Sequence, residues 1–138
     1  MQVSEETLHS LAKNYNSTTY NYTGGDGPIQ RSYLLDINPW YLERELGDGM
    51  NVIDGRWIDT STGLFVDITG LSHRETNLHT NTHIWMCKHN HRYLLDDLFP
   101  LRESTFEGVK AKMIPYAYIA ILEEEYSDLA LERTEFHG

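Results

Sequence analysis

The pattern of apolar and polar positions predicts an α+β chain that begins with a helix. Ser4 is a favourable N-cap residue, and the two glutamates that follow it suit the positive end of a helix dipole. Leu8, Leu11 and Tyr15 then fall on one helical face. These signals predict a helix over residues 5–15.

Period-two patterns follow the helix and indicate strands. Apolar residues alternate over 29–37, and the runs 51–59 and 64–71 flank a short polar turn that ends in glycine, which is typical of a β-hairpin. The polar segments 18–28 and 72–83 lack periodicity and are expected to be loops.

The remaining elements are shorter. We expect a helical turn at 40–46, short strands around a turn within 98–109, a helix over 116–125 and a further helical turn after a break near Ser127. Glycine-rich turns are expected at 24–27 and 47–49, and residues 85–95 fit either kind of element.

Composition narrows the possible functions. The 138 residues carry a formal net charge of -10, which disfavours binding to nucleic acid or to anionic lipid. Cys87 is the single cysteine, so it forms no internal disulfide, and its type favours a small buried apolar residue over a nucleophile. The start has no signal-peptide pattern, and no apolar run is long enough to cross a bilayer, so the chain as written is expected in the cytoplasm.

Asp67 is the sharpest local signal of chemistry, because it interrupts an apolar strand. Alternation places it on one face with Phe65 and Thr69, whereas Val66 and Ile68 lie on the other face. A carboxylate inside a sheet needs a cation or exposure to water. Asp67 therefore either faces solvent on a half-exposed hairpin or binds a metal ion.

Charged residues on the preceding strand have simple structural readings. Asp54 and Arg56 share a face, which favours a surface ion pair, and Asp59 is placed to bond the backbone of the turn that follows it. Arg56 could instead bind a substrate phosphate, because its planar guanidinium suits that anion.

Two further patterns leave alternatives open. Five histidines (73, 79, 83, 89 and 91) surround Cys87 and fit a solvated loop or, without standard ligand spacing, a zinc site. Asn16 and Asn21 begin two N-x-[S/T] sequons, which would be glycosylated only in a protein that enters a lumen.

Several motifs together resemble the C-terminal part of the LicD family, which includes bacterial phosphocholine transferases, fukutin and fungal proteins of mannosyl-phosphate transfer. The motifs are VIDGRWID (52–59), GLFVDIT (63–69), HRYLLDDLFPL (91–101) with the D-x-x-P-L pattern, FEG (106–108) and IPY (114–116). DTSTGLF (59–65) and TGL (69–71) are similar to the fungal branch.

The resemblance implies a nucleotidyltransferase-like mixed β-sheet with flanking helices, incomplete at its N-terminus, as one partial domain over 1–138. It implies transfer of a phosphate-linked group from a nucleotide-activated donor to a cell-surface or secretory glycan, with Mg²⁺ or Mn²⁺ as cofactor. A full-length parent would sit in the Golgi or secretory-pathway membrane.

The resemblance carries only some site residues over. The family's D-x-D pair would precede Gln2, where this sequence has only Met1. Asp67 resembles the family's third carboxylate and is the expected catalytic and metal-binding residue. The motif residues His91, Asp97, Pro100 and Pro115 are expected to stabilise the fold.

Two functional hypotheses follow, and a third possibility is a generic α+β module that resembles the family by chance. In the first, the chain belongs to a metal-dependent phosphotransferase but is inactive alone, because it lacks the paired aspartates. In the second, it is a non-catalytic helper that binds a glycan or associates with a full-length relative.

Overall fold

The computed structural model describes residues 1–23, 30–45 and 52–132. The chain divides into two compact units, one formed by Met1–Glu75 with Trp85–Arg92 and the other by Thr76–Ile84 with Tyr93–Gly138. The predicted glycine turns at 24–27 and 47–49, and the predicted strand residue Ile29, lie outside the described residues.

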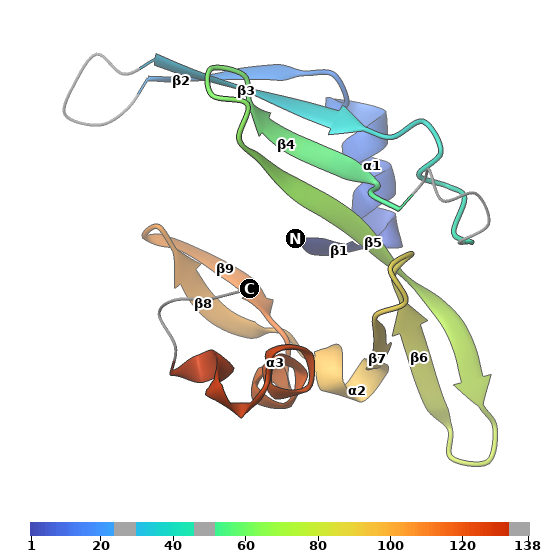
Figure 1. The fold of residues 1–138 in the computed structure, drawn as a ribbon. Helices are drawn as coiled ribbons and strands as arrows, with labels where there is room; N and C mark the ends of the chain where they lie inside the picture. Colours follow the sequence, from blue (N-terminus) through green and yellow to red (C-terminus); the bar gives the residue numbers. More distant parts are fainter. Residues whose placement is uncertain (24–29, 46–51, 133–138) are drawn as a thin grey trace. The chain divides into compact units, whose positions relative to one another are not determined.

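A mixed β-sheet organises the first unit (Figure 1). Its strands are hydrogen-bonded in the order β2-β3-β4-β5-β6-β7, and β1 pairs with β5 in parallel. The strands are β1 (Gln2–Ser4), β2 (Thr19–Thr23), β3 (Gln30–Ile37), β4 (Gly55–Asp59), β5 (Phe65–Asn77), β6 (Thr82–Met86) and β7 (Arg92–Leu94). Most of these residues lie in the first unit, whereas residues 76–77 of β5, 82–84 of β6 and 93–94 of β7 belong to the second unit. This arrangement confirms the predicted α+β class.

Helix α1 (Glu5–Tyr15) packs on one face of this sheet and has the predicted bounds. The Ser4 hydroxyl accepts a hydrogen bond from the Thr7 amide at 3.1 Å, which confirms the predicted N-cap. Leu8 is fully buried and forms the core with Leu35 and Ile37 of β3 and Ile68 of β5. The apolar face of the helix and the period-two face of the strands therefore meet as their patterns require.

The β4–β5 hairpin confirms the strongest strand prediction. Arg56 pairs with Asp67 and Trp57 with Val66 in antiparallel register. Ile68 lies on the core side, so Asp67 lies on the opposite face of the sheet, as alternation predicted. The sheet thus has one face covered by α1 and another that carries Asp67.

Two segments expected to be loops are strands instead. Residues 19–23 form β2, which pairs with β3, and β5 continues through residue 77 before β6 begins at residue 82. Both segments are polar because they are largely exposed on both faces, so they show no apolar period. Hydrogen bonds to neighbouring strands impose the extended conformation there.

The helical turn expected at 40–46 does not form a helix. Its described residues form successive turns, in which the Tyr41 amide donates to the Asn38 carbonyl and the Glu43 amide donates to the Trp40 carbonyl.

The second unit contains a helical turn, a hairpin and a C-terminal helix (Figure 1). Its elements are α2 (Leu95–Leu98), β8 (Arg102–Phe106), β9 (Val109–Ile114), α3 (Tyr118–Tyr126) and the 3₁₀ turn η1 (Asp128–Leu131). The predicted helix and terminal turn are confirmed, with α3 beginning two residues later than expected. The short strands expected within 98–109 are confirmed only from residue 102 on, because Leu98 ends α2 and the observed hairpin spans residues 102–114 with its turn at 107–108. Ser127 has φ of 79° between α3 and η1, which explains the predicted break.

Asp54 is a fully buried charged residue of the first unit, and the predicted surface pair with Arg56 is wrong. Its side chain is fully buried and forms salt bridges with Arg44 Nη1 at 2.9 Å and Lys88 Nζ at 2.8 Å. Its second oxygen accepts a hydrogen bond from the Gly70 amide at 2.7 Å. Sequence reasoning missed this cluster because Arg44 and Lys88 are distant along the chain.

The cluster ties three separate segments to the centre of β5. Arg44 also donates to the Tyr41 and Gly70 carbonyls, and Lys88 donates to the Trp40 carbonyl at 3.3 Å. A Cβ at Gly70 would lie 2.8 Å from a Leu8 methyl and 2.9 Å from the Arg44 guanidinium. Glycine at this position therefore lets the cation and the helix approach the strand together.

We expect Asp54→Ala to destabilise the first unit strongly, because it leaves two buried cations without their carboxylate. Loss of one partner of a buried ion pair costs about 3–5 kcal/mol. Urea unfolding followed by tryptophan fluorescence measures this unit, since all three tryptophans (40, 57 and 85) belong to it. The control Asp36→Ala removes an exposed aspartate of β3 and should change stability by less than about 0.5 kcal/mol. Equal stability of the two variants would contradict the role of the cluster.

Candidate functional site

Three charged residues form a row across the sheet face that carries Asp67. Asp36 of β3 is the register partner of Arg56 on β4, and Arg56 is the partner of Asp67 on β5. A cavity of about 430 Å³ adjoins the row and is lined by Asp36, Asn38, Pro39, Val52, Ile53, Gly55 and Arg56. Acidic and basic groups thus meet beside a hollow on the face opposite α1.

Arg56 is held in place by Asp67 and by an aromatic ring. Its Nε donates to the Asp67 carboxylate at 2.7 Å, and its guanidinium carbon lies 4.3 Å from the centre of the Phe65 ring. The two charged side chains are 45% and 38% exposed, so the pair is accessible to a ligand. Arg56 keeps terminal nitrogens with which a planar guanidinium binds phosphate oxygens.

Asp67 by itself does not fit a divalent metal ion. No group of three or more histidine, cysteine or acidic side chains that could hold a metal occurs in the part of the chain that the structure describes. Arg56 lies between Asp67 and Asp36 in the row, and it already compensates the Asp67 charge. Within the described residues Asp67 is part of a carboxylate–guanidinium pair, and its role as a metal ligand stays a prediction.

Asp59 confirms the predicted role at the start of the β4–β5 turn. One carboxylate oxygen accepts hydrogen bonds from the amides of Ser61 at 2.8 Å and Thr62 at 3.3 Å, and the other accepts from Arg31 at 3.0 Å. The Ser61 amide bond is the main cause that lowers the pKa of Asp59 below its usual value of 3.8. The carboxylate thus fixes the hairpin geometry on which the Arg56–Asp67 register depends.

His91 joins its loop to β1. Its Nδ1 lies 3.5 Å from both the Gln2 side-chain nitrogen and the Cys87 sulfur, and its ring stacks on His89 with centres 6.1 Å apart. Cys87 is buried, as expected of a small apolar residue. This packing favours the structural interpretation of His91.

The other motif residues lie in the second unit. The Asp97 carbonyl accepts the Ala117 amide at 2.9 Å, Pro100 follows a cis peptide bond, and Pro115 connects β9 to the turn before α3. The bond between Asp97 and Ala117 connects α2 with the start of α3, which fits the expected structural role of Asp97. The structural roles of Pro100 and Pro115 stay predictions.

The two sequon asparagines are exposed and take part in local hydrogen bonds. Asn16 Oδ1 accepts the Ile37 amide at 2.9 Å, and Asn21 Oδ1 accepts the Ser32 hydroxyl at 3.1 Å. Their use as glycosylation sites stays a prediction.

Sequence reasoning found Asp67 and Arg56 but missed Asp36 and Asn38. Asp36 is an acidic residue between Leu35 and Ile37 in an alternating strand, a signal equal to that of Asp67 on its own strand. Asn38 lines the cavity and donates from its side chain to the Ile53 carbonyl at 3.1 Å, a contact that no local pattern indicates.

Comparison with known proteins gives partial similarity to two curated proteins of Saccharomyces cerevisiae. The chain is 50% identical to Mannosyltransferase regulator 4 over 40 residues, which cover 29% of the chain and 3% of that protein. It is 33% identical to Mannosyltransferase regulator 14 over 72 residues, which cover 52% of the chain and 8% of that protein. The chain therefore spans less than a tenth of the length of either relative.

No family model matches the chain, and no solved structure matches it. Among the described helices, none has both the length and the apolar character required to cross a membrane.

The lowered pKa of Asp59 predicts that the stability of the fold depends on pH in the acidic range. Because its pKa is lower in the folded state, the carboxylate stabilises the fold fully above about pH 4, and this contribution is lost as the pH falls through the folded-state pKa. We expect Asp59→Asn to be less stable than the wild type at pH 7. The difference in urea midpoint should shrink between pH 4 and pH 2; a constant difference would contradict the role of the ionised carboxylate.

Proposed function

We propose that this chain functions in the modification of mannose-containing glycans, as part of a LicD-like phosphotransferase domain. The observation that carries the proposal is the Arg56–Asp67 pair on an accessible sheet face beside a cavity. The partial similarity to the two yeast mannosyltransferase regulators supports the glycan class. The LicD-like motifs support a phosphate-linked group from a nucleotide-activated donor as the transferred species.

The register of β1 supports the role of Asp67. Gln2 is the parallel partner of Thr69, and the Met1 amine donates to the Asp67 carbonyl at 2.6 Å. In this register Met1 lies opposite Ile68. If β1 continues upstream in a longer protein, the residue directly before Met1 would therefore pair with Asp67, and the residue two positions before that one would pair with Phe65. Side chains at alternate positions share a face, so a D-x-D pair there would lie beside Asp67. In such a protein these carboxylates would provide oxygen ligands for Mg²⁺ or Mn²⁺.

Arg56 would have a separate role in this proposal. Its cation lies between two acidic residues of the sheet and next to the cavity. There it would bind and orient donor phosphate oxygens through its terminal nitrogens. Asp67 in turn would hold Arg56 in position through the 2.7 Å bond and accept the proton of the glycan hydroxyl.

A regulatory function is the second candidate, and two observations favour it. Both relatives are named as regulators of mannosyltransferases. Leu64, which precedes β5, and Phe65 and Val66, which begin it, are also 72%, 51% and 50% exposed. A contiguous exposed apolar segment on a strand fits contact with another protein chain. In this case the chain would bind a transferase instead of performing the transfer.

Asp67→Asn in the full-length protein tests the catalytic proposal. Each phosphodiester adds a negative charge to a glycan, so binding of a cationic dye to the cell surface measures transfer. Loss of a group that acts in proton transfer should lower the rate at least about 100-fold. The matched control is Asp96→Asn, which removes an exposed aspartate of α2 in the second unit and should leave transfer unchanged.

Leu64→Asp in the same assay separates the two functions. The regulatory function predicts that this change lowers transfer by disrupting a protein contact, while Asp67→Asn retains normal transfer. The catalytic function predicts the reverse. Normal transfer by Asp67→Asn in correctly folded protein would overturn the catalytic proposal.

A further inference from the structure

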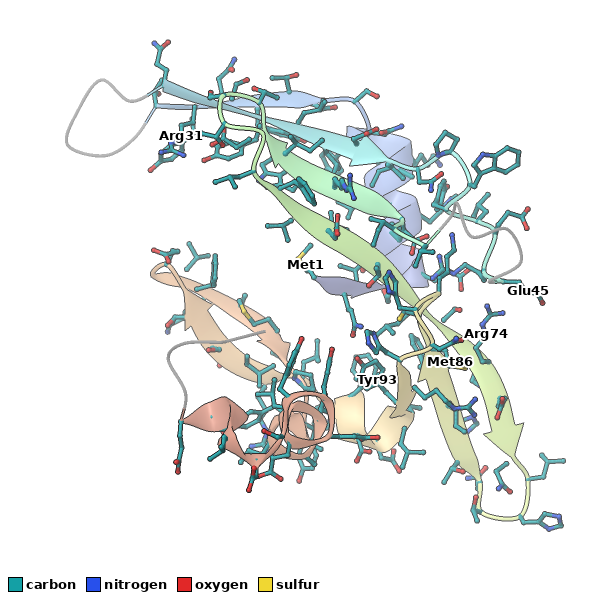
Figure 2. All side chains as sticks on the ribbon, viewed as in Figure 1. Met1, Arg31, Glu45, Arg74, Met86 and Tyr93 are labelled. Carbon is teal, nitrogen blue, oxygen red and sulfur yellow. The ribbon has the colours of Figure 1, made fainter. Side chains whose placement is uncertain are left out.

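A second cavity lies in the first unit and shares no lining residue with the cavity beside Arg56. Its volume is about 310 Å³, at the lower end of the range for small-molecule sites. Arg44, Glu45, Arg74, Glu75 and Asn90 supply its polar lining. Figure 2 labels Glu45, Arg74 and Met86, which approach this cavity from the loop after β3, from β5 and from β6.

The buried charge next to this cavity is unbalanced. Arg44 and Lys88 both pair with the single carboxylate of Asp54. The Arg44 side chain is only 9% exposed, and its Nε–H has no hydrogen-bond acceptor in the described structure. A buried cation without full compensation is costly, and a buried donor without an acceptor adds to that cost. An anion in the adjacent cavity would reduce the electrostatic part of this free-energy cost, because it would compensate the extra positive charge.

The rim adds charges of both signs. Glu75 is neutralised by Arg92 at 2.9 Å. Arg74 and Glu45 line the cavity without a salt bridge to any residue in the described part of the chain. The charged lining residues themselves are balanced, with Arg44 and Arg74 against Glu45 and Glu75. Their ion-pair network adds Lys88 and Arg92 against Asp54, so the described residues of the lining and the network carry four formal cations and three formal carboxylates in a chain of net charge -10.

We propose that this cavity binds a small oxyanion of the phosphate class, held by the Arg74 guanidinium and the side-chain amide of Asn90 and favoured by the excess positive charge of the Arg44–Lys88 cluster. The guanidinium of Arg74 has the planar geometry that matches phosphate oxygens. The site goes beyond the proposed function, because none of its lining residues belongs to the Arg56–Asp67 row.

Titration of the protein with orthophosphate, followed by backbone amide NMR, tests the site. Chloride and acetate at matched ionic strength distinguish phosphate from general screening, and a hexose phosphate distinguishes free phosphate from a phosphorylated sugar. We expect saturable shifts at the Arg44, Arg74 and Asn90 amides with orthophosphate. Shifts without saturation, or equal shifts with chloride, would show an adventitious ion only and overturn the proposal.

Two variants at the rim of the cavity should change the affinity for phosphate in opposite directions. Arg74→Gln removes a charge-assisted hydrogen bond and should weaken phosphate binding at least about tenfold. Glu45→Gln removes a repelling charge and should strengthen it about two- to fivefold. The control Lys13→Gln changes an exposed cation in the last turn of α1 and should leave affinity unchanged. Equal phosphate affinities in all three variants would overturn the proposed oxyanion site. This result would leave the proposed function, which depends on Asp67, unaffected.

Discussion

The buried carboxylate of Asp54 is the interaction on which the first unit depends. It lies fully out of solvent between Arg44 and Lys88 and also accepts the Gly70 amide, so it fixes two connecting segments against β5. Removing any one charged partner would leave the others in a medium where water cannot compensate them. The position of β5, and hence of Asp67 on its outer face, is therefore coupled to this cluster.

The two faces of the sheet carry different kinds of side chains, because successive side chains of a strand point to opposite faces. One face carries Leu35, Ile37 and Ile68 and is covered by α1. The other carries the Asp36–Arg56–Asp67 row and adjoins a cavity. A scaffold of this kind keeps charged groups accessible at low cost, since the apolar side chains between them are buried on the opposite side.

Electrostatics distinguishes the cavity beside Arg56 from the cavity beside Arg44. Beside Arg56, one cation lies between two acidic residues, so a bound phosphate would need additional positive charge from elsewhere. Beside Arg44, formal positive charge already exceeds negative charge. The proposed transferase function and the proposed oxyanion site therefore use different residues of β5: Asp67 belongs to the first, and Arg74 and Glu75 belong to the second.

Local sequence patterns determined the elements that have an apolar period or a distinctive cap. The bounds of α1, its Ser4 cap, the β4–β5 hairpin and the Asp59 turn all follow from interactions between near neighbours. The same patterns singled out Arg56 and Asp67. Tertiary structure alone decided the polar strand β2, the extension of β5, the partners of Asp54 and the proximity of Asp36 to Arg56. Those features depend on groups that are distant in sequence, and hydrogen bonding or charge compensation between such groups leaves no local period to read.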